Sequence, residues 1–560
     1  MTDLFHDYPA LPAWDEMLDD ELEVRTSSGP VHEQLAGLSA AEVSSRADSL
    51  ARSYLNQGVT FDFAGEERPF PLDVVPRVLD ADEWTTISTG VSQRVRALEA
   101  FLDDVYGDQQ VVADGVVPQK LILSSTEFQR EAFGIRPPNG VRAHVSGIDL
   151  VRDVDGRFRV LEDNVRIPSG VSYVISNRRA MAQTFPELFS KLQIRPVIGY
   201  PRRLLTALIA AAPEGVPDPT VVVLTPGVYN SAYFEHTLLA RLMGVELVEG
   251  RDLFVAQGRV WMRTTEGRRR VDVIYRRVDD AFLDPVQFRA DSLLGVPGLM
   301  GVARLGNVTL ANAVGNGVAD DKLVYTYVPD LIRYYLGEQP IIANVDTWRL
   351  EEPDALEEVV DRLAELVVKP VDGAGGKGIL VGPQASAHEI DAMRERLRRD
   401  PRGWIAQPVV QLSTSPTLID DRFRPRHVDL RPFAVNDGEN VWVLPGGLTR
   451  VALPEGQLVV NSSQGGGSKD TWVLGSPVHD HPAGGTHAGA EPVSDEELEA
   501  EAITEAEDAV AEAEDADVGH PSARPDLAVR EVARQQHEPA ADKHRSQPEQ
   551  QQQQAGGPTC

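Results

Sequence analysis

Apolar residues recur at three- and four-residue spacing between residues 91 and 105, and this period predicts a helix with one buried face. The stripe consists of Val91, Val95, Leu98, Phe101, Leu102 and Val105. Core packing is the obvious interpretation of such a stripe. We expect a mostly helical region in the first 140 residues of the chain.

A pattern typical of strands follows in the stretch VRAHVSGIDLVRDVDGRFRVLEDN. It predicts two strands joined by a turn at Asp153-Val-Asp-Gly156. Because side chains alternate between the two faces of a strand, Glu162 and Asn164 are expected on one face and Asp163 on the other. Carboxylate and amide oxygens together suit magnesium, which prefers oxygen ligands. A polar strand edge would have the same letters, so that alternative stays open.

Residues 220–253 contain an apolar β-branched run, an amphipathic segment that ends at Gly244, and a second apolar run. They predict a strand, a helix and a strand, which together make one βαβ unit. Two helical segments follow at residues 323–337 and 353–366. A mixed α/β architecture is therefore expected.

The stretch VVKPVDGAGGKGILVG, residues 367–382, contains a glycine-rich loop that satisfies the dinucleotide-binding pattern GxGxxG. A Rossmann fingerprint needs a helix after its glycines, but residues 379–381 predict a strand. A P-loop needs Ser or Thr after its lysine, where this chain has glycine. The remaining interpretation is a hairpin lid over a triphosphate, with Lys369 on the entering strand. The alternative is a glycine-rich turn with solvated lysines. The loop residues assigned to nucleotide binding are Gly373, Gly375, Gly376, Lys377 and Gly378.

Composition narrows the class of protein. The chain has 560 residues, a formal net charge of −32 and one cysteine, Cys560, so intrachain disulfides and thiolate-rich metal sites are excluded. The first residues lack the basic start and apolar run that are typical of a secretory signal, and no stretch has the apolar length of a membrane-spanning helix, so we expect no export. Its acidity disfavours nonspecific binding to nucleic acid or anionic lipid. We expect a soluble, cytoplasmic protein that binds neither nucleic acid nor membrane.

From about His481 the chain becomes rich in Ala, Glu and Asp, and then in Gln. Few large apolar residues remain to build a core, so a disordered acidic tail is predicted there. Such a tail is expected to act as a tether or to recruit partner proteins. A solvated acidic helix at residues 494–517 is the alternative for part of it.

The order of these motifs resembles the ATP-grasp superfamily, in the circularly permuted branch that includes glutathionylspermidine synthase and the circularly permuted type 2 ATP-grasp proteins. The resemblance to the type 2 proteins covers nearly all of residues 1–478. The permutation is visible because Glu162-Asp-Asn164 precedes the lysines and the glycine-rich loop. The resemblance implies a circularly permuted ATP-grasp fold of mixed α/β class.

Five regions are then expected. They are a mostly helical region at 1–140, the metal-ligand strands of the permuted core at 141–200, a βαβ domain like a pre-ATP-grasp domain at 201–318, nucleotide-binding lobes with the glycine-rich lid at 319–478, and the tail at 479–560.

The resemblance also implies a metal and phosphate site. In the family, a carboxylate followed by Glu-x-Asn ligates metal ions between the ATP phosphates, and Asp149, Glu162 and Asn164 look like that set. Lys322 resembles the lysine that contacts the phosphates, with Lys369 as a second cation. A solvated lysine at a helix end is the alternative for Lys322.

Other polar residues have weaker assignments. Gln407 resembles the residue that holds the adenine edge, and a surface amide is its alternative. Arg431 and Arg450 could stabilise an acylphosphate because a guanidinium binds two oxygens at once. Since Asp429 lies close to Arg431 in sequence, a structural Asp–Arg pair is equally compatible. Residues Asn461 to Val473 form a second glycine-rich polar stretch without an assigned role.

The function that the resemblance implies is an ATP- and Mg²⁺-dependent carboxylate–amine ligase that works through an acylphosphate. Its partners would be a carboxylate and an amine, with a peptide or protein as one option. Two other hypotheses remain: a phosphotransferase that stops at a phosphorylated product, and a nucleotide-binding scaffold without turnover.

Overall fold

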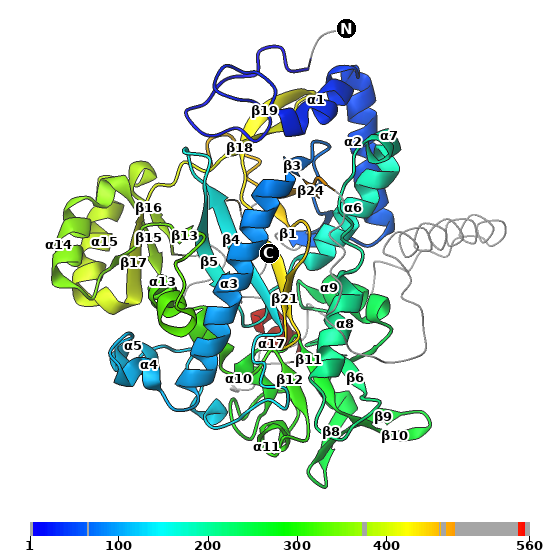
Figure 1. Ribbon diagram of the computed structural model, residues 1–560, viewed down its shortest axis with the longest axis vertical. Helices are drawn as coiled ribbons and strands as arrows, with labels where there is room; N and C mark the ends of the chain where they lie inside the picture. The colour runs from blue at the N-terminus through cyan, green and yellow to red at the C-terminus, as the bar shows by residue number, and fades with distance from the viewer. Residues whose placement is uncertain are drawn as a thin grey trace, which may run out of the picture. The chain divides into compact units, whose positions relative to one another are not determined.

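The computed structural model describes residues 4–63, 66–371, 378–457, 460, 466–475 and 547–554 (Figure 1). Most of the expected lid, namely Gly373, Gly375, Gly376 and Lys377, lies outside the described residues, and so does most of the expected tail. Helices surround several separate sheets, which confirms the mixed α/β class.

A five-stranded sheet carries the two strands expected to hold the metal ligands. β4 (Val145–Arg152) and β5 (Phe158–Asn164) pair antiparallel around a turn at Gly156, as predicted. β20 (Phe433–Asn436) and β21 (Val441–Val443) extend the sheet beyond β4. β13 (Ala343–Asn344) extends it beyond β5. Strands from three distant parts of the sequence thus share one sheet, which crosses the expected region boundary at residue 200.

A second sheet, called the lid sheet below, has the order β14-β17-β15-β16. Its strands are β14 (Trp348–Arg349), β17 (Trp404–Pro408), β15 (Leu366–Pro370) and β16 (Leu380–Val381). β15 and β16 pair antiparallel on either side of the glycine-rich loop, so the predicted strand–loop–strand arrangement is confirmed.

One face of the lid sheet packs against two helices, α14 (Pro353–Asp361) and α15 (Ala387–Arg399), as Figure 1 shows. Val368 and Ala406 are paired in the sheet and are buried with these helices. Because side chains alternate along a strand, Lys369 and Gln407 belong to the opposite face. The two helices therefore pack only on the apolar face of the lid sheet, and Lys369 and Gln407 lie on its other face.

A parallel sheet has the order β12-β11-β6-β7. It contains the predicted βαβ unit, formed by β6 (Val221–Leu224), α9 (Tyr233–Met243) and β7 (Glu246–Val248). The helix ends as predicted at Gly244, whose φ of +68° is easiest for glycine. The other strands are β11 (Val273–Arg276) and β12 (Thr309–Ala311).

The described part of the N-terminal region combines helices with short strands and loops. Its long helix, α3 (Ala81–Val105), begins with Asp80 as a capping residue and buries all six positions of the apolar stripe. The other described helices of eight residues or more are α1 (Gly29–Ala36), α2 (Ala40–Asn56), α6 (Val171–Thr184), α8 (Tyr200–Ala210) and α17 (Gln547–Gln554). Across the described ranges, no helix is both long and apolar enough to cross a membrane.

The shorter helices are α4 (Gln110–Ala113), α5 (Gln119–Leu123), α7 (Pro186–Lys191), α10 (Asp280–Leu283), α11 (Leu299–Arg304), α12 (Lys322–Tyr325) and α13 (Val328–Leu331). The small sheets comprise β1 (Thr60–Phe63), β2 (Glu66–Pro69), β3 (Arg77–Leu79), β8 (Leu253–Ala256), β9 (Arg259–Thr264), β10 (Gly267–Val271), β18 (Thr414–Ile419), β19 (Arg422–His427), β22 (Thr449–Val451), β23 (Gly467–Lys469) and β24 (Thr471–Val473).

Three segments differ from the sequence predictions. The single helix expected over residues 323–337 is broken into α12, α13 and a π-helical turn, because Pro329, the second residue of α13, lacks an N–H donor. The second glycine-rich stretch becomes strands β23 and β24 from Gly467 onward, while residues 461–465 lie outside the described residues. The helix α17 lies inside the expected tail.

Candidate functional site

The β4–β5 hairpin places the predicted metal ligands as their alternation requires. Asp149 is paired with Glu162 across the two strands. The amide nitrogen of Asn164 lies 3.5 Å from Oδ1 of Asp149. On the opposite face, the carboxylate of Asp163 is buried and accepts hydrogen bonds of 2.5 and 2.7 Å from the guanidinium of Arg94 on α3. Asp163 is thus a structural residue, and the other three carboxylate and amide groups meet on the site face.

Asp149 lies at the centre of a buried ionic network. Arg431 donates to both of its oxygens, at 2.5 and 2.8 Å, and Arg450 donates to Oδ2 at 2.7 Å. Arg450 also binds Asp429. Burial alone would raise the pKa of the Asp149 carboxyl, but the two guanidinium groups outweigh it and lower this pKa to about 2. Asp149 therefore carries a full negative charge next to two permanent cations.

Two lysines face the hairpin from different elements. The ammonium of Lys322, the first residue of α12, lies 3.3 Å from the Glu162 carboxylate. The ammonium of Lys369 on the lid sheet donates to Oε1 of Gln407 at 2.6 Å. Burial lowers the pKa of Lys369 to about 8, the Glu162 charge raises it, and the neighbouring charge of Lys322 lowers it further. The charges of Lys322 and Glu162 thus both act on Lys369, although the three residues come from different elements.

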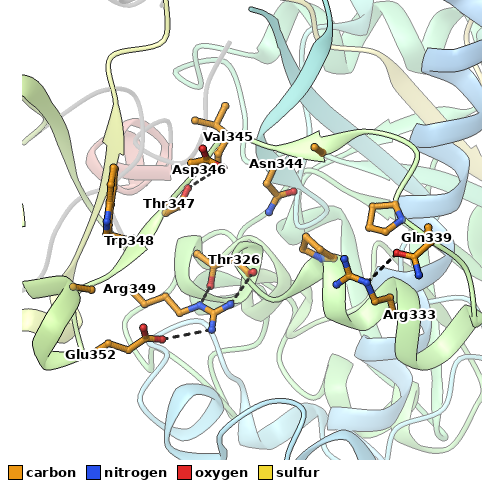
Figure 2. A pocket seen from close by; sticks show the side chains of 14 residues that line it. Thr326, Arg333, Gln339, Asn344, Val345, Asp346, Thr347, Trp348, Arg349 and Glu352 are labelled. Atoms are coloured by element: carbon orange, nitrogen blue, oxygen red, sulfur yellow. Dashed lines mark hydrogen bonds and ion pairs between the residues drawn. The ribbon is translucent and has the colours of Figure 1, made fainter. Parts of the chain in front are cut away.

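Gln407 is held by the chain that links the two sheets. Its amide nitrogen donates to Oγ1 of Thr347 at 3.0 Å, and Thr347 lies between β13 and β14. A cavity of about 550 Å³ borders this link. Figure 2 shows Arg349 in its wall, with hydrogen bonds to Thr326 and an ion pair with Glu352. Thr347 in this link therefore both lines the cavity and binds the predicted site residue Gln407.

Magnesium is implied by the resemblance, and the donor chemistry permits a fit. Glu162 offers a carboxylate with 32% of its side chain exposed, and Asn164 offers an amide oxygen, both of which are hard ligands. Both oxygens of Asp149 already bind Arg431 or Arg450, so Asp149 would have to share them with a metal ion. No group of three or more His, Cys, Asp or Glu side chains suited to a metal occurs in the part of the chain that the structure describes. Water and phosphate oxygens would have to complete the coordination.

Sequence reasoning missed Asp320, which lies two positions before Lys322 in the chain. The partly buried carboxylate of Asp320 accepts from the backbone N–H of Val165 at 2.6 Å and of Arg166 at 3.3 Å. Burial raises its pKa to about 8 although Arg166 lowers it. Asp321 is a different kind of residue, because it caps α12 by accepting from Leu323 N–H. Asp320 thus fixes the chain that follows β5 against the loop that precedes Lys322.

All predicted site residues inside the described ranges, except Gly378, are brought into contact with at least one other. The contacts are Asp149 with Asn164, Arg431 and Arg450, Glu162 with Lys322, and Lys369 with Gln407. Gly378 follows the part of the loop that is not described and has a φ of +78°. The roles of these residues toward a nucleotide stay predictions.

Comparison with known proteins places this arrangement in a family. The family described as "Circularly permuted ATP-grasp type 2" matches residues 76–452. An uncharacterized protein of Mycobacterium tuberculosis (strain ATCC 25618 / H37Rv) is 63% identical over 462 residues, 82% of this chain and 84% of the relative. An uncharacterized protein of Synechocystis sp. is 53% identical over 468 residues, 82% of this chain and 97% of the relative.

A Frankia casuarinae protein named "Putative glutamate--cysteine ligase 2-2" is 46% identical over 464 residues. The match covers 82% of this chain and 53% of that protein, so the chain spans about half of its length. Among solved structures, a glutathione synthetase-like effector from Globodera pallida superposes with a TM-score of 0.50 at 9% identity, over 77% of this chain and 96% of the effector. That structural similarity concerns the fold alone. The family match and the close relatives show that the chain belongs to the circularly permuted type 2 ATP-grasp family.

Proposed function

We propose that this protein is an ATP- and Mg²⁺-dependent carboxylate–amine ligase that forms an amide bond through an acylphosphate. Membership of an ATP-grasp family supports the use of ATP. The observation that carries the proposal is that the Lys322 ammonium lies 3.3 Å from the Glu162 carboxylate and that the charges of both act on Lys369 of the lid sheet. Two ammonium groups beside a carboxylate suit a triphosphate with its metal ion.

The proposed reaction has two steps. A carboxylate oxygen of the acid attacks the γ-phosphorus of ATP, the bond to the β–γ bridging oxygen breaks, and ADP leaves. The amine nitrogen then attacks the acyl carbon, phosphate leaves with the electron pair, and the nitrogen loses a proton. Because the phosphoryl group passes directly to the substrate, the protein needs no covalent nucleophile of its own.

The residues would contribute charge and position. Lys322 and Lys369 would neutralise the phosphate oxygens, and Glu162 and Asn164 would hold the metal. Magnesium, when bound, supplies further charge neutralisation along the triphosphate. Lys369 and Gln407 touch each other, so they would meet adjacent parts of one nucleotide. Arg431 and Arg450 are committed to Asp149 and Asp429, and we propose that they position Asp149 rather than bind the acylphosphate.

The test is ADP production with ATP, magnesium and pooled carboxylates and amines, including short peptides, with mass analysis of the products. Glutamate and cysteine form the first pair, because the name of the Frankia casuarinae relative points to them. ADP that requires both an acid and an amine, together with a product mass of acid plus amine minus water, supports the ligase. A phosphorylated product without any amine requirement would indicate a phosphotransferase. Binding of ATP without ADP from any pool would favour a scaffold.

Two variants show whether ADP comes from the proposed site. Glu162→Gln removes a charge and keeps the side-chain shape, and Lys369→Ala removes a cation. Lys120→Ala is the matched control, because Lys120 is 77% exposed and forms a surface ion pair with Glu351. ADP formation that persists in both site variants would place the activity elsewhere.

A further inference from the structure

The helix α17 packs against the domain that contains the parallel sheet. Its glutamines Gln550 and Gln551 are buried, with 0% and 4% exposure, whereas Gln552 and Gln553 on the same helix are exposed. Such burial is unusual because a buried primary amide needs partners for both its oxygen and its nitrogen. The two buried glutamines therefore need a site that is built for them.

The loop between α10 and α11 forms hydrogen bonds with both the oxygen and the nitrogen of the Gln550 side-chain amide. The backbone N–H of Leu293 donates to Oε1 at 2.8 Å, and Nε2 donates to the carbonyl oxygen of Asp291 at 2.6 Å. The hydroxyl of Ser292 holds this loop by donating to the carbonyl of Phe282 at 2.6 Å. A donor and an acceptor fixed in this order match a carboxamide. A carboxylate has no hydrogen to give to the Asp291 carbonyl.

The loop after β6 receives Gln551. The N–H of Tyr229 lies 3.3 Å from its Oε1. Gly227 makes room for the same amide, since a Cβ at this position would lie 2.5 Å from Nε2 of Gln551. Gly227 has a φ of +116°, so it combines a conformation reserved for glycine with a close approach by the side chain.

This loop lies at a position where ligands commonly bind in parallel sheets. It follows the carboxyl end of β6, and ligands of open α/β sheets bind outside the carboxyl ends of the strands. The loop is also tied to the sheet and its helix, because Oγ1 of Thr225 lies 2.9 Å from Nδ1 of His236 on α9. Helix α17 thus covers the edge of the domain at which a ligand would be expected.

We propose that the loops after β6 and before α11 form a binding site for two adjacent glutamine side chains, and that the chain's own segment Gln547–Gln554 fills it. The site would accept a peptide that presents consecutive primary carboxamides. Another ligand that binds at the carboxyl end of β6 would compete with α17 for this position. This inference concerns a region outside the ATP site and does not depend on the proposed ligase activity.

The first experiment measures hydrogen–deuterium exchange of the full-length chain in peptides that cover residues 225–232 and 289–296. The variant Gln550→Ala/Gln551→Ala should exchange at least about tenfold faster at the amides of Tyr229 and Leu293, because both lose their acceptors. The control Gln552→Ala/Gln553→Ala should match the wild type, since these side chains are exposed. A third variant replaces all five glutamines from Gln550 to Gln554 with alanine. It is needed because, in the double variant, a neighbouring pair of glutamines could shift into the site.

Each outcome of this experiment either supports or overturns the proposal. Faster exchange in the double variant but not in the control supports the site, and faster exchange only in the five-residue variant supports it with a shifted register. Unchanged exchange in the double and five-residue variants would overturn the proposal. Protection that falls on dilution of the wild type would show that the segment docks between copies, which overturns the assignment to the chain's own segment.

A second experiment adds the labelled peptide QPEQQQQQ in trans. It should bind the five-residue variant, whose site is open, at least about tenfold more tightly than the wild type, where a tethered competitor is present at high effective concentration. The peptide QPEAAQQQ is the first control and QPEAAAAA is the second. Equal binding of all three peptides, or no binding of any, would count against a glutamine site.

Discussion

The guanidinium of Arg431 binds both carboxylate oxygens of Asp149, with Nε 2.5 Å from Oδ1 and the NH2 nitrogen 2.8 Å from Oδ2. Both side chains are buried, and the pair joins residues that lie 282 positions apart. It connects β4 to the segment that precedes β20. The packing of the five-stranded sheet and the charge of the candidate site therefore depend on the same interaction.

The first prediction concerns this pair. Arg431→Met leaves Asp149 with one arginine partner in a buried site, and breaking a buried ion pair costs about 3–5 kcal/mol of unfolding free energy. Urea unfolding checks the value. Arg333→Met is the control, since Arg333 is 48% exposed and pairs with Asp330 on the surface, where the cost is at most about 1 kcal/mol. Equal destabilisation by the two changes would contradict the structural role of the pair.

The pH dependence of stability follows from the same carboxylate. The pKa of Asp149 is lowered from 3.8 to about 2 in the folded protein, so its stabilising contribution is complete above about pH 4 and is lost as the pH falls toward 2. Arg431→Met removes part of that lowering. We therefore expect the unfolding free energy of the variant to depend less steeply on pH between 4 and 2. An unchanged slope would show that Asp149 does not titrate in this window.

The pKa of Lys369 leads us to expect that activity falls at high pH. Its pKa of about 8 means that the free protein loses the ammonium charge as the pH rises through 8. If this charge attracts the triphosphate, kcat/KM for ATP should fall above about pH 8, because this parameter reports groups of the free enzyme. The variant Lys369→Arg stays charged and should lose this limb. A limb that persists at the same pH in that variant would assign it to another group.

Substitutions of two neighbouring acids of β5 are expected to affect different properties, namely turnover for Glu162 and stability for Asp163. Glu162→Gln should reduce ATP turnover by about 10²-fold or more, with little change in stability, because the side chain is partly exposed at the predicted metal site. Asp163→Asn leaves the buried guanidinium of Arg94 without its charge partner, so it should cost several kcal/mol of stability. Paired unfolding and activity measurements check both. The interpretation fails if Glu162→Gln is the more destabilising change.

The sequence predicted the parts of the site that depend on local periodicity. The turn at Gly156 and the two-residue alternation were sufficient to place Glu162 and Asn164 on one face and Asp163 on the other. The strands around the glycine-rich loop were predictable because Val367 and Val368 before it and residues 379–381 after it are apolar, most of them β-branched. Each of these features is determined within about twenty residues of chain, where propensity and turn chemistry dominate.

Pairings between distant segments were not predictable in this way. Nothing near Asp149 in the sequence indicates that Arg431 and Arg450 surround it, and Asp429 left two interpretations open. Lys469 belonged to a polar stretch without an assigned role, yet it is buried and binds Asp73 and the carbonyl of Pro416. Helix α17 was missed for a related reason, since hydrogen bonds rather than apolar contacts hold its glutamines.

The five-stranded sheet has a consequence for the synthesis of the protein. β4 begins at Val145 and its neighbour β20 at Phe433, so the ribosome makes the hairpin long before the strand that completes its edge. At roughly 5–20 residues per second, the interval is on the order of 15–60 s. During that time Asp149 has neither of its arginines. The nascent chain must keep the β4 edge hydrated or shielded, and the candidate site can assemble only after β20 and the segment with Arg450 have been made.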